Sequence, residues 1–223
     1  MPVALPDIKA YVFDAYGTLF DYASAAARCR DVLGDKLDPL NALWREKQLQ
    51  YTWLRALQGR HGDFWQVTGD ALDFALETLG LGDARLRARL MDLYLTLDAF
   101  PEVPETLRRL KAGGVKTAIL SNGTPDMLDA AVGNVGIGDL LDAVLSVEAV
   151  GVYKPHPKVY HLAVDRFGIP AWRSRSNRQT PGTPTPPRLS ACESCGATVT
   201  GSGRSGCRAN RTMRSGHWRS CLR

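Results

Sequence analysis

Short apolar runs alternate with helix-like segments from residue 100 to residue 167, and this alternation constrains the fold more than any other feature of the chain. An earlier apolar run, residues 8–13, ends at Asp14. The expected strands are residues 8–13, 115–120 and 143–147, and the expected helices are residues 103–111, 125–132 and 157–167. Strands that alternate with helices form a parallel, doubly wound sheet. We therefore predict an α/β core.

The segment from residue 22 to residue 97 has an almost entirely helical pattern. One apolar face at helical spacing consists of Leu40, Leu43, Trp44, Tyr51, Leu54 and Leu57. Apolar residues within 64–79 and 86–97 predict two further helices, and most of these side chains are expected simply to pack helix against helix. Because the segment follows the first strand, we predict a helical cap, residues 22–97, inserted into a core formed by residues 1–21 and 98–171.

The composition changes abruptly after Ala171. Residues 172–223 contain ten arginines and a single acidic residue, Glu193, which gives this tail a net charge of +9, whereas the whole chain has +5 and the first 171 residues have −4. The only leucine, isoleucine or valine residues of the tail are Leu189, Val199 and Leu222. Burial of these three side chains cannot offset the entropy lost when the segment is ordered. We therefore predict a disordered basic tail.

Several classes of protein are disfavoured by the rest of the composition. No apolar run approaches the length of a membrane span, and the first residues lack a basic start followed by an apolar stretch. Apart from the tail, Cys29 is the single cysteine, so no disulfide framework is indicated. We expect a cytoplasmic protein that binds neither membrane nor nucleic acid.

Polar residues follow each of the three predicted strands. Asp14 follows the first strand, Ser121 and Asn122 follow the second, and Lys154 comes shortly after the third. Parallel strands end at one edge of the sheet, so these residues are expected to converge there, with Asp14 as a candidate nucleophile. Each residue alone also has a structural explanation: a helix cap for Asp14, turn chemistry for Ser121 and Asn122, and a solvated charge for Lys154.

The order of these motifs resembles the type II L-2-haloacid dehalogenases of the haloacid dehalogenase superfamily, from about residue 8 to residue 170. The motifs are Phe-Asp-Ala-Tyr-Gly-Thr-Leu-Phe-Asp at 13–21, Leu-Trp-Arg-Glu-Lys-Gln-Leu at 43–49, Tyr-Thr-Trp-Leu-Arg at 51–55, Ile-Leu-Ser-Asn-Gly at 119–123 and Val-Tyr-Lys-Pro at 152–155. The resemblance implies a Rossmann-like core with a helical cap. It also implies hydrolysis of L-2-haloalkanoic acids to D-2-hydroxy acids by water, without metal or organic cofactor, often by a homodimer.

The resemblance assigns roles to matching positions. Asp14 would displace halide from C2 of the substrate and form an ester, and Thr18 would help to orient it. Arg45 of the cap would meet the departing halide together with Asn122, a task suited to a side chain that stays charged. Lys154 would stabilise the ionised form of Asp14.

The remaining roles concern the substrate. Ser121 and the backbone of Ala15 and Tyr16 would hold its carboxylate, and Tyr160 would lie close to Lys154. The apolar wall around its alkyl part would consist of Tyr16, Leu49 and Phe64. Leu49 lies one helical turn beyond Arg45, so both can face one cavity. Plain packing is the alternative for these three side chains.

Tyr16 separates two enzyme classes. Phosphatases of the superfamily carry a second aspartate at this position, which protonates the leaving group and helps to bind Mg²⁺. A phenol replaces that carboxylate here, and a hard cation prefers carboxylate oxygens. Phosphatase activity is therefore the lesser alternative.

The family pattern breaks after Ala171. The relatives continue with a strand and a Ser-Ser-Asn-x-Trp-Asp-like segment whose aspartate helps to activate the hydrolytic water, and no such segment follows here. Residues 179–184, Gln-Thr-Pro-Gly-Thr-Pro, can be encoded by CAA ACG CCT GGG ACG CCT, which reads Asn-Ala-Trp-Asp-Ala two bases on. We therefore interpret the tail as the product of a frameshift, or of a sequencing error, that replaces the last strands of the core.

Two alternatives follow from the tail. The chain could be a non-catalytic remnant of a dehalogenase. The tail could also be a zinc or nucleic-acid module built on Cys192, Cys195, Cys207, His217 or Cys221 and its arginines, but the spacing beyond the first cysteine pair fits no compact zinc finger.

Overall fold

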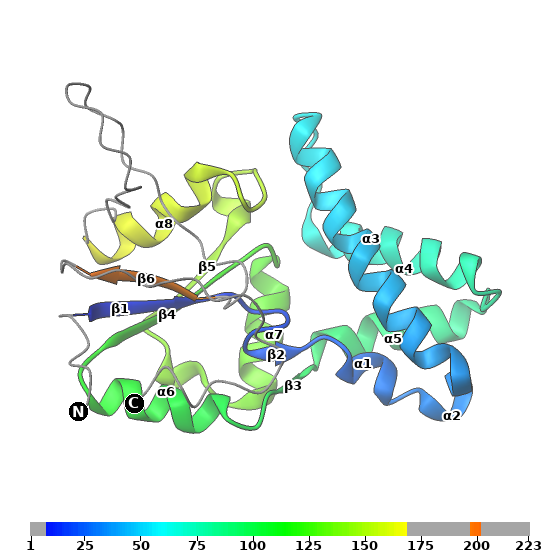
Figure 1. The fold of residues 1–223 in the computed structure, drawn as a ribbon, viewed down its shortest axis with the longest axis horizontal. Helices are drawn as coiled ribbons and strands as arrows, with labels where there is room; N and C mark the ends of the chain where they lie inside the picture. Colours follow the sequence, from blue (N-terminus) through cyan, green and yellow to red (C-terminus); the bar gives the residue numbers. More distant parts are fainter. Residues whose placement is uncertain (1–7, 169–196, 202–223) are drawn as a thin grey trace, which may run out of the picture.

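The computed structural model describes residues 8–168 and 197–201. A sheet flanked by helices forms one end of the molecule, and five helices gather at the other end (Figure 1). The two ends are joined where the chain leaves the sheet after β1 and where it returns before α6.

The sheet has the strand order β5-β4-β1-β6. Its strands are β1 (Ile8–Phe13), β4 (Lys116–Ser121), β5 (Ala143–Ser146) and β6 (Ala197–Gly201). β1 pairs in parallel with β4, and β4 pairs in parallel with β5, with Phe13 level with Ile119 and Ser121 level with Ser146. This arrangement confirms the parallel α/β core predicted from the alternation of strands and helices.

Helices cover both faces of the sheet: α6 (Val103–Ala112) and α7 (Pro125–Val135) lie on one face and α8 (Pro157–Phe167) on the other (Figure 1). Two short 3-10 turns, η2 (Gly138–Leu140) and η3 (Val147–Ala149), flank β5. The local sequence explains the ends of α7, because Thr124 caps its first turn by accepting a bond from the Met127 N–H and Gly136 ends it in the left-handed conformation.

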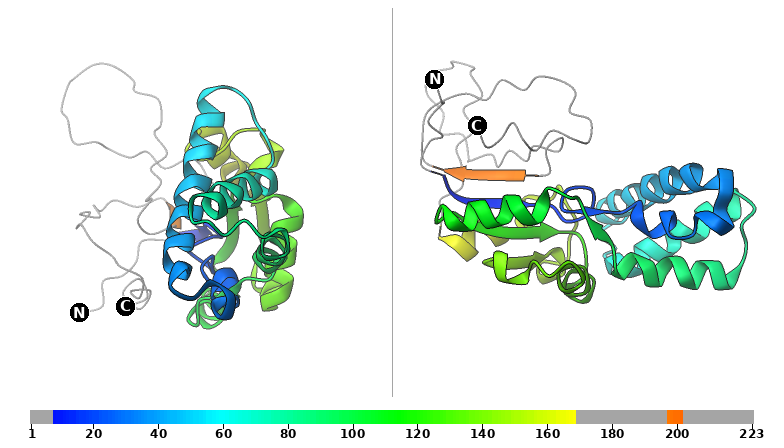
Figure 2. Two further views of the ribbon diagram at one scale, coloured as in Figure 1. Left: turned by 90° about the vertical axis from the view of Figure 1, so that its right-hand side faces the viewer. Right: turned by 90° about the horizontal axis from the view of Figure 1, so that it is seen from below.

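The cap helices follow one another from residue 24 to residue 95. They are α1 (Ser24–Ala27), α2 (Arg30–Leu33), the 3-10 turn η1 (Gly34–Lys36), α3 (Leu37–Leu57), α4 (Phe64–Thr78) and α5 (Ala84–Leu95). Asp63 and Asp83 cap α4 and α5 through their side chains, as expected for aspartates before a helical run. Viewed along the long axis of the molecule, these helices stand in front of the carboxyl edge of the sheet (Figure 2).

The buried face of α3 differs from the predicted apolar face. The helix buries Leu37, Leu40, Trp44, Gln48 and Thr52, which follow one another at three- and four-residue spacing. The predicted face was wrong at its end, because Leu54 and Leu57 are 51% and 85% exposed. The second half of α3 therefore buries polar side chains and leaves apolar ones in solvent.

Two very short strands lie at the junction between the ends of the molecule. β2 (Phe20–Asp21) pairs antiparallel with β3 (Asp98–Ala99). The Asp98 N–H donates to Ser24 Oγ over 3.0 Å, and Arg28 forms an ion pair with the Asp98 carboxylate. The chain thus leaves the sheet and returns to it at adjacent points.

Most of the basic tail lies outside the described residues. The exception is β6, which pairs antiparallel with the free edge of β1 and corrects, for residues 197–201, the prediction that residues 172–223 lack regular structure. The edge of β1 offers unpaired backbone groups, and the β-branched run Thr198, Val199 and Thr200 favours an extended strand.

A bilayer could not be crossed by any helix in the described part of the chain, since each is too short or too polar.

Candidate active site

The carboxyl ends of β1, β4 and β5 meet at one edge of the sheet because the three strands are parallel. Asp14 follows β1, Ser121 ends β4, and Lys154 lies in the loop after η3. The fold therefore brings these three residues to the same edge of the sheet.

Asp14 is held through one of its two carboxylate oxygens. The Oδ1 atom accepts a hydrogen bond from the Ala15 N–H over 2.7 Å and lies 3.0 Å from the Lys154 Nζ atom. Across residues 8–168 and 197–201 every hydrogen bond or ion pair of this side chain goes to Oδ1. The other oxygen, Oδ2, is the one available to attack an electrophile.

The loop after Asp14 folds tightly on one carbonyl group. The Ala15 carbonyl oxygen accepts from the backbone N–H groups of Thr18, Leu19 and Phe20 over 3.3, 2.9 and 3.0 Å. Gly17 has φ of +84°, a conformation that side-chain-bearing residues rarely adopt, and its N–H donates to the Phe20 carbonyl over 2.7 Å. This turn returns the buried Thr18 toward the end of β1.

The two polar residues after β4 each have one hydrogen-bonding function fixed by the backbone. Ser121 Oγ accepts from the Gly123 N–H over 3.2 Å, so its own hydroxyl hydrogen can be donated elsewhere. Asn122 Oδ1 accepts from the Lys154 N–H over 3.0 Å, which leaves the amide nitrogen as a donor. Both side chains therefore offer donors, which suit an anionic ligand.

Tyr16 fills the space between the loop and the cap. Its ring is 4% exposed and lies 5.7 Å from the Phe64 ring and 5.4 Å from the Tyr94 ring, measured between centroids. Burial raises the pKa of the Tyr16 phenol well above its usual value, and Tyr94 and the carboxylate of Asp14 add to this effect. Tyr16 is thus a neutral, largely apolar surface beside Asp14.

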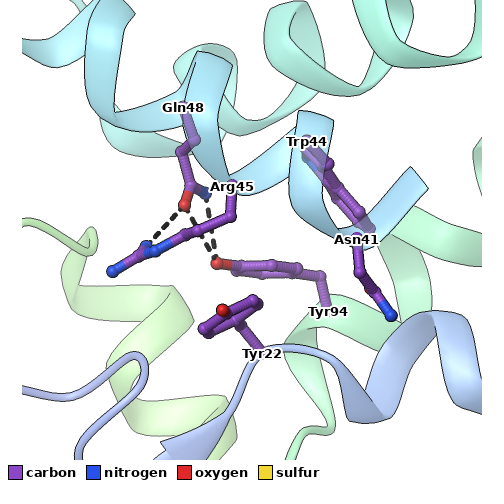
Figure 3. A pocket seen from close by; sticks show the side chains of 6 residues that line it. All are labelled: Tyr22, Asn41, Trp44, Arg45, Gln48 and Tyr94. Atoms are coloured by element: carbon purple, nitrogen blue, oxygen red, sulfur yellow. Dashed lines mark hydrogen bonds between the residues drawn. The ribbon is translucent and has the colours of Figure 1, made fainter. Parts of the chain in front are cut away.

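Arg45 reaches from α3 toward this loop. Its Nη2 atom donates to the Tyr16 carbonyl oxygen over 3.2 Å, and its guanidinium carbon lies 5.0 Å from the centroid of the Tyr22 ring. Its Nη1 atom donates to Gln48 Oε1 over 2.7 Å (Figure 3). The cap therefore places one cation against the loop that follows Asp14.

Gln48 belongs to a buried polar network that the sequence analysis missed. Its Nε2 atom donates to Thr68 Oγ1 over 2.7 Å and to the Tyr94 hydroxyl over 3.1 Å. A signal for this network exists in the sequence: Gln48 lies four residues after Trp44, on the stripe that begins with Leu37 and Leu40, so a glutamine stands where an apolar residue is expected.

A small cavity lies behind Arg45 on the cap side. It is lined by Tyr22, Asn41, Trp44, Arg45, Gln48 and Tyr94 (Figure 3). Its volume of about 10 Å³ is the room that a single water molecule needs. With the side chains in this arrangement, the cavity has no room for a molecule larger than water.

A second set of cap-to-core contacts was also missed. His61 Nε2 lies 2.8 Å from Glu148 Oε2, and the Tyr153 hydroxyl donates to the Gly62 carbonyl. The Tyr153 ring packs 4.8 Å from the His61 ring and 6.3 Å from the Phe64 ring. Burial is the main cause that raises the pKa of the Tyr153 phenol, which directly precedes Lys154.

The structure also locates the other predicted site residues. Phe64 is fully buried at the start of α4 and faces Tyr16, whereas Leu49 is half-buried on α3 and does not line the small cavity. Tyr160 lies near the start of α8 with a buried side chain. The roles assigned to these residues stay predictions.

The donor set at Asp14 fits a metal ion poorly. A lysine ammonium group contacts the carboxylate, and the nearby position of a second carboxylate is taken by Tyr16. In the part of the chain that the structure describes, there is no group of three histidine, cysteine, aspartate or glutamate side chains arranged to hold a metal.

The model of the haloacid dehalogenase-like hydrolases matches residues 8–174, three-quarters of the chain. The chain belongs to this family. The matched segment ends near Ala171, where the composition of this hydrolase changes.

Curated relatives of this haloacid dehalogenase-like hydrolase include (S)-2-haloacid dehalogenases. It is 50% identical over 163 residues to a (S)-2-haloacid dehalogenase of Pseudomonas sp. strain YL, a match that spans 73% of this chain and 70% of the relative. A (S)-2-haloacid dehalogenase 4A of Burkholderia cepacia is 46% identical over 73% of this chain and 71% of its own. The structure of L-2-haloacid dehalogenase from Xanthobacter autotrophicus with chloropropionic acid covalently bound matches with a TM-score of 0.67 and 47% identity, over 73% of this chain and 66% of that one.

Proposed function

We propose that this chain cleaves the carbon–halogen bond of L-2-haloalkanoic acids by nucleophilic attack of Asp14. The single observation that carries the proposal is the geometry of Asp14, whose Oδ1 atom is held by the Ala15 N–H and Lys154 while Oδ2 is left to react. Relatives at 46% and 50% identity are (S)-2-haloacid dehalogenases, and one solved relative holds chloropropionic acid covalently.

In the first step Oδ2 attacks C2 of the substrate from the side opposite the halogen. A carbon–oxygen bond forms, the carbon–halogen bond breaks, and its electron pair leaves with the halide. Arg45 and the Asn122 amide nitrogen, both of them donors, receive that anion. The attack inverts the configuration at C2 and leaves the substrate as an ester of Asp14.

The Ser121 hydroxyl and the backbone near Tyr16 would bind the substrate carboxylate, whereas the Ala15 N–H is already bonded to Asp14 Oδ1. Tyr16, Phe64 and Leu49 would enclose its alkyl part, with Tyr16 staying neutral because burial raises the pKa of its phenol. Thr18 and Tyr160 would support Asp14 and Lys154, as the resemblance implies.

In the second step a water molecule attacks the carboxyl carbon of the Asp14 ester, releasing a D-2-hydroxy acid and regenerating the carboxylate. The segment that relatives use for this water is replaced after Ala171, and the tail lies largely outside the described residues. We therefore expect halide release to proceed at least once per chain, with slow or absent turnover.

A frameshift remains our explanation for the tail, and resequencing the gene together with the mass of the intact protein tests it.

The decisive experiment mixes the purified chain with a slight excess of L-2-chloropropionate and follows both products of the first step. We expect release of about one chloride per active chain and a propionate adduct on the peptide that contains Asp14. Mild alkaline cleavage of the adduct should yield D-lactate, since hydrolysis at the acyl carbon leaves C2 untouched. The Asp14→Asn variant should release no halide.

Two other functions predict different results. A non-catalytic remnant would give folded protein with neither chloride nor adduct. A superfamily phosphatase, the lesser alternative, would release phosphate from a phosphate ester only with Mg²⁺, and here Tyr16 stands where such an enzyme carries a second carboxylate.

Assembly and location are further proposals. We propose a cytoplasmic homodimer, as the resemblance implies. The apolar side chains exposed on α3, Trp53, Leu54 and Leu57, give the first place to test the dimer. Light scattering of the native chain and of Leu57→Glu should show a dimer that the substitution weakens; a native monomer would contradict the proposal.

A further inference from the structure

We propose that Gln48 is a positioning residue that holds the Arg45 guanidinium group toward the loop after Asp14, through a network anchored on α4 and α5. This role rests on the proposed dehalogenation, since Arg45 is the residue proposed to bind the departing halide.

Arg45 needs support because a long side chain with several rotatable bonds otherwise samples many positions. The Arg45 side chain is half-buried, and each of its two terminal nitrogens donates one hydrogen bond. Nη1 donates to Gln48 Oε1 over 2.7 Å, and Nη2 donates to the Tyr16 carbonyl oxygen over 3.2 Å. A guanidinium group has five N–H donors, so three remain for an anion. Of these two hydrogen bonds, the one to Gln48 is the shorter.

Gln48 itself has little freedom. Its side chain is 1% exposed, and its amide oxygen and nitrogen both have partners. The Thr68 hydroxyl donates to the Phe64 carbonyl over 2.7 Å, so its oxygen is the acceptor for Gln48 Nε2. This chain of bonds fixes which end of the Gln48 amide faces Arg45, because only the oxygen can accept from a guanidinium.

The anchors of the network come from three cap helices. The Trp44 Nε1–H donates to the Thr68 carbonyl over 2.9 Å and ties α3 to α4, and the Tyr94 hydroxyl of α5 accepts from Gln48 over 3.1 Å. Tyr94 also packs against Trp44 and against Tyr16. The direction of Arg45 is therefore set by the packed interior of the cap.

A fixed guanidinium group would act on the reaction by having its donors in place before charge develops on the halide. Chloride concentrates its charge on a smaller ion than bromide does, and it leaves carbon less readily. Loss of Gln48 should therefore slow the displacement of chloride more than that of bromide. A merely structural glutamine would slow both equally, through a smaller fraction of folded chain.

The test uses the full-length chain in single-turnover halide release with L-2-chloropropionate and L-2-bromopropionate. We expect Gln48→Leu to slow chloride release by about 10- to 100-fold, bromide release by a smaller factor, and to leave the half-saturating substrate concentration nearly unchanged. The matched control is Gln50→Leu on the same helix, whose amide bonds only Glu46 and Lys47 among the described residues. It should behave as the native chain does.

A double-mutant cycle with Arg45→Ala isolates the route of the effect. If Gln48 acts through Arg45, adding Gln48→Leu to Arg45→Ala changes the rate of bromide release little. Equal slowing for chloride and bromide, an undiminished effect in the Arg45→Ala background, or native rates in Gln48→Leu would each overturn the proposal.

Thr68→Val keeps the inference testable where Gln48→Leu does not fold. Valine keeps the shape of threonine and removes the hydroxyl that orients Gln48, so we expect the same chloride-selective slowing, by about 3- to 10-fold. An unselective or absent effect in a folded Thr68→Val chain counts against the role of Gln48. Failure of the native chain to release either halide is a separate result, which overturns the proposed function and this role with it.

Discussion

The core side and the cap side of the site are built in different ways. On the core side, Asp14, Ser121 and Asn122 each bond a backbone N–H at or near a strand end, over 2.7, 3.2 and 3.0 Å. On the cap side, Arg45 is held mainly by the side chain of Gln48, which depends in turn on Thr68 and Tyr94. The geometry of the core side therefore follows from the path of the backbone, whereas the geometry of the cap side depends on particular side chains. Single substitutions on the cap side should therefore loosen the positioning of Arg45 step by step.

The largest effect should come from the core side. Replacing Lys154 with methionine removes the ammonium group that lies 3.0 Å from Asp14 Oδ1, and we expect single-turnover chloride release to slow by about 100- to 1,000-fold. Lys158→Met, on the exposed start of α8, is the matched control and should leave the rate unchanged. A Lys154→Met rate within threefold of native would mean that Asp14 does not depend on this contact.

Asn122→Asp separates the two functions of one side chain. The aspartate keeps an oxygen for the Lys154 N–H but replaces the amide donor with negative charge, so halide release should slow by about 10- to 100-fold without loss of folding. Circular dichroism and the rate of halide release measure the two effects independently. An unchanged rate would show that the amide nitrogen does not meet the anion.

Buried phenols from both sides should make the fold sensitive to alkali. Burial raises the pKa of Tyr16 and of Tyr94, so in the folded chain both stay protonated to higher pH than in the unfolded chain. The two phenols contribute to the free energy of unfolding, and this contribution is fully present below about pH 10. It is lost as the pH rises above that value, at up to about 1.4 kcal/mol per pH unit for each phenol.

Urea unfolding between pH 9 and pH 11 measures this slope. Tyr16→Phe should flatten the slope by the share of one phenol, with little change at pH 8, because the Tyr16 hydroxyl has no hydrogen-bond partner among the described residues. An equally steep slope in the variant would show that Tyr16 is not a source of the alkaline sensitivity.

The smallest effect should come from the contact between residue 62 of the cap and the core. Tyr153→Phe removes the hydroxyl that donates to the Gly62 carbonyl, and we expect a loss of about 1 kcal/mol in the free energy of unfolding. Urea midpoints at pH 8 test this, with Tyr51→Phe on α3 as the control. Equal midpoints for native and Tyr153→Phe chains would assign no net stability to this bond.

The same contrast explains what the sequence could predict. Strands with apolar runs and parallel connections predict where their ends converge, so Asp14, Ser121, Asn122 and Lys154 could be grouped without a structure. The helix over residues 157–167 was predicted with the bounds that the structure gives. The two-residue strands β2 and β3 were missed because they are too short to show a periodicity.

The features that the sequence did not predict depend on contacts between distant parts of the chain. Gln48 is polar yet buried because Arg45, Thr68 and Tyr94 satisfy its amide, and partners on three helices are not visible in the spacing of one. Leu54 and Leu57 continue the apolar spacing of α3 but lie in solvent, since a pattern does not say where the neighbouring helix ends. β6 was missed because its partner is the edge of a strand almost two hundred residues earlier.

The short ladder between β2 and β3 has an evolutionary consequence. Since the chain enters and leaves the helical segment at paired residues, Asp21 opposite Asp98, a recombination event that cuts at these two points exchanges the whole segment without lengthening either connection. Arg45 would travel with Gln48, Thr68 and Tyr94, and the receiving sheet would keep its own nucleophile. The proposed halide-binding group could thus be inherited as one block, separately from the proposed nucleophile.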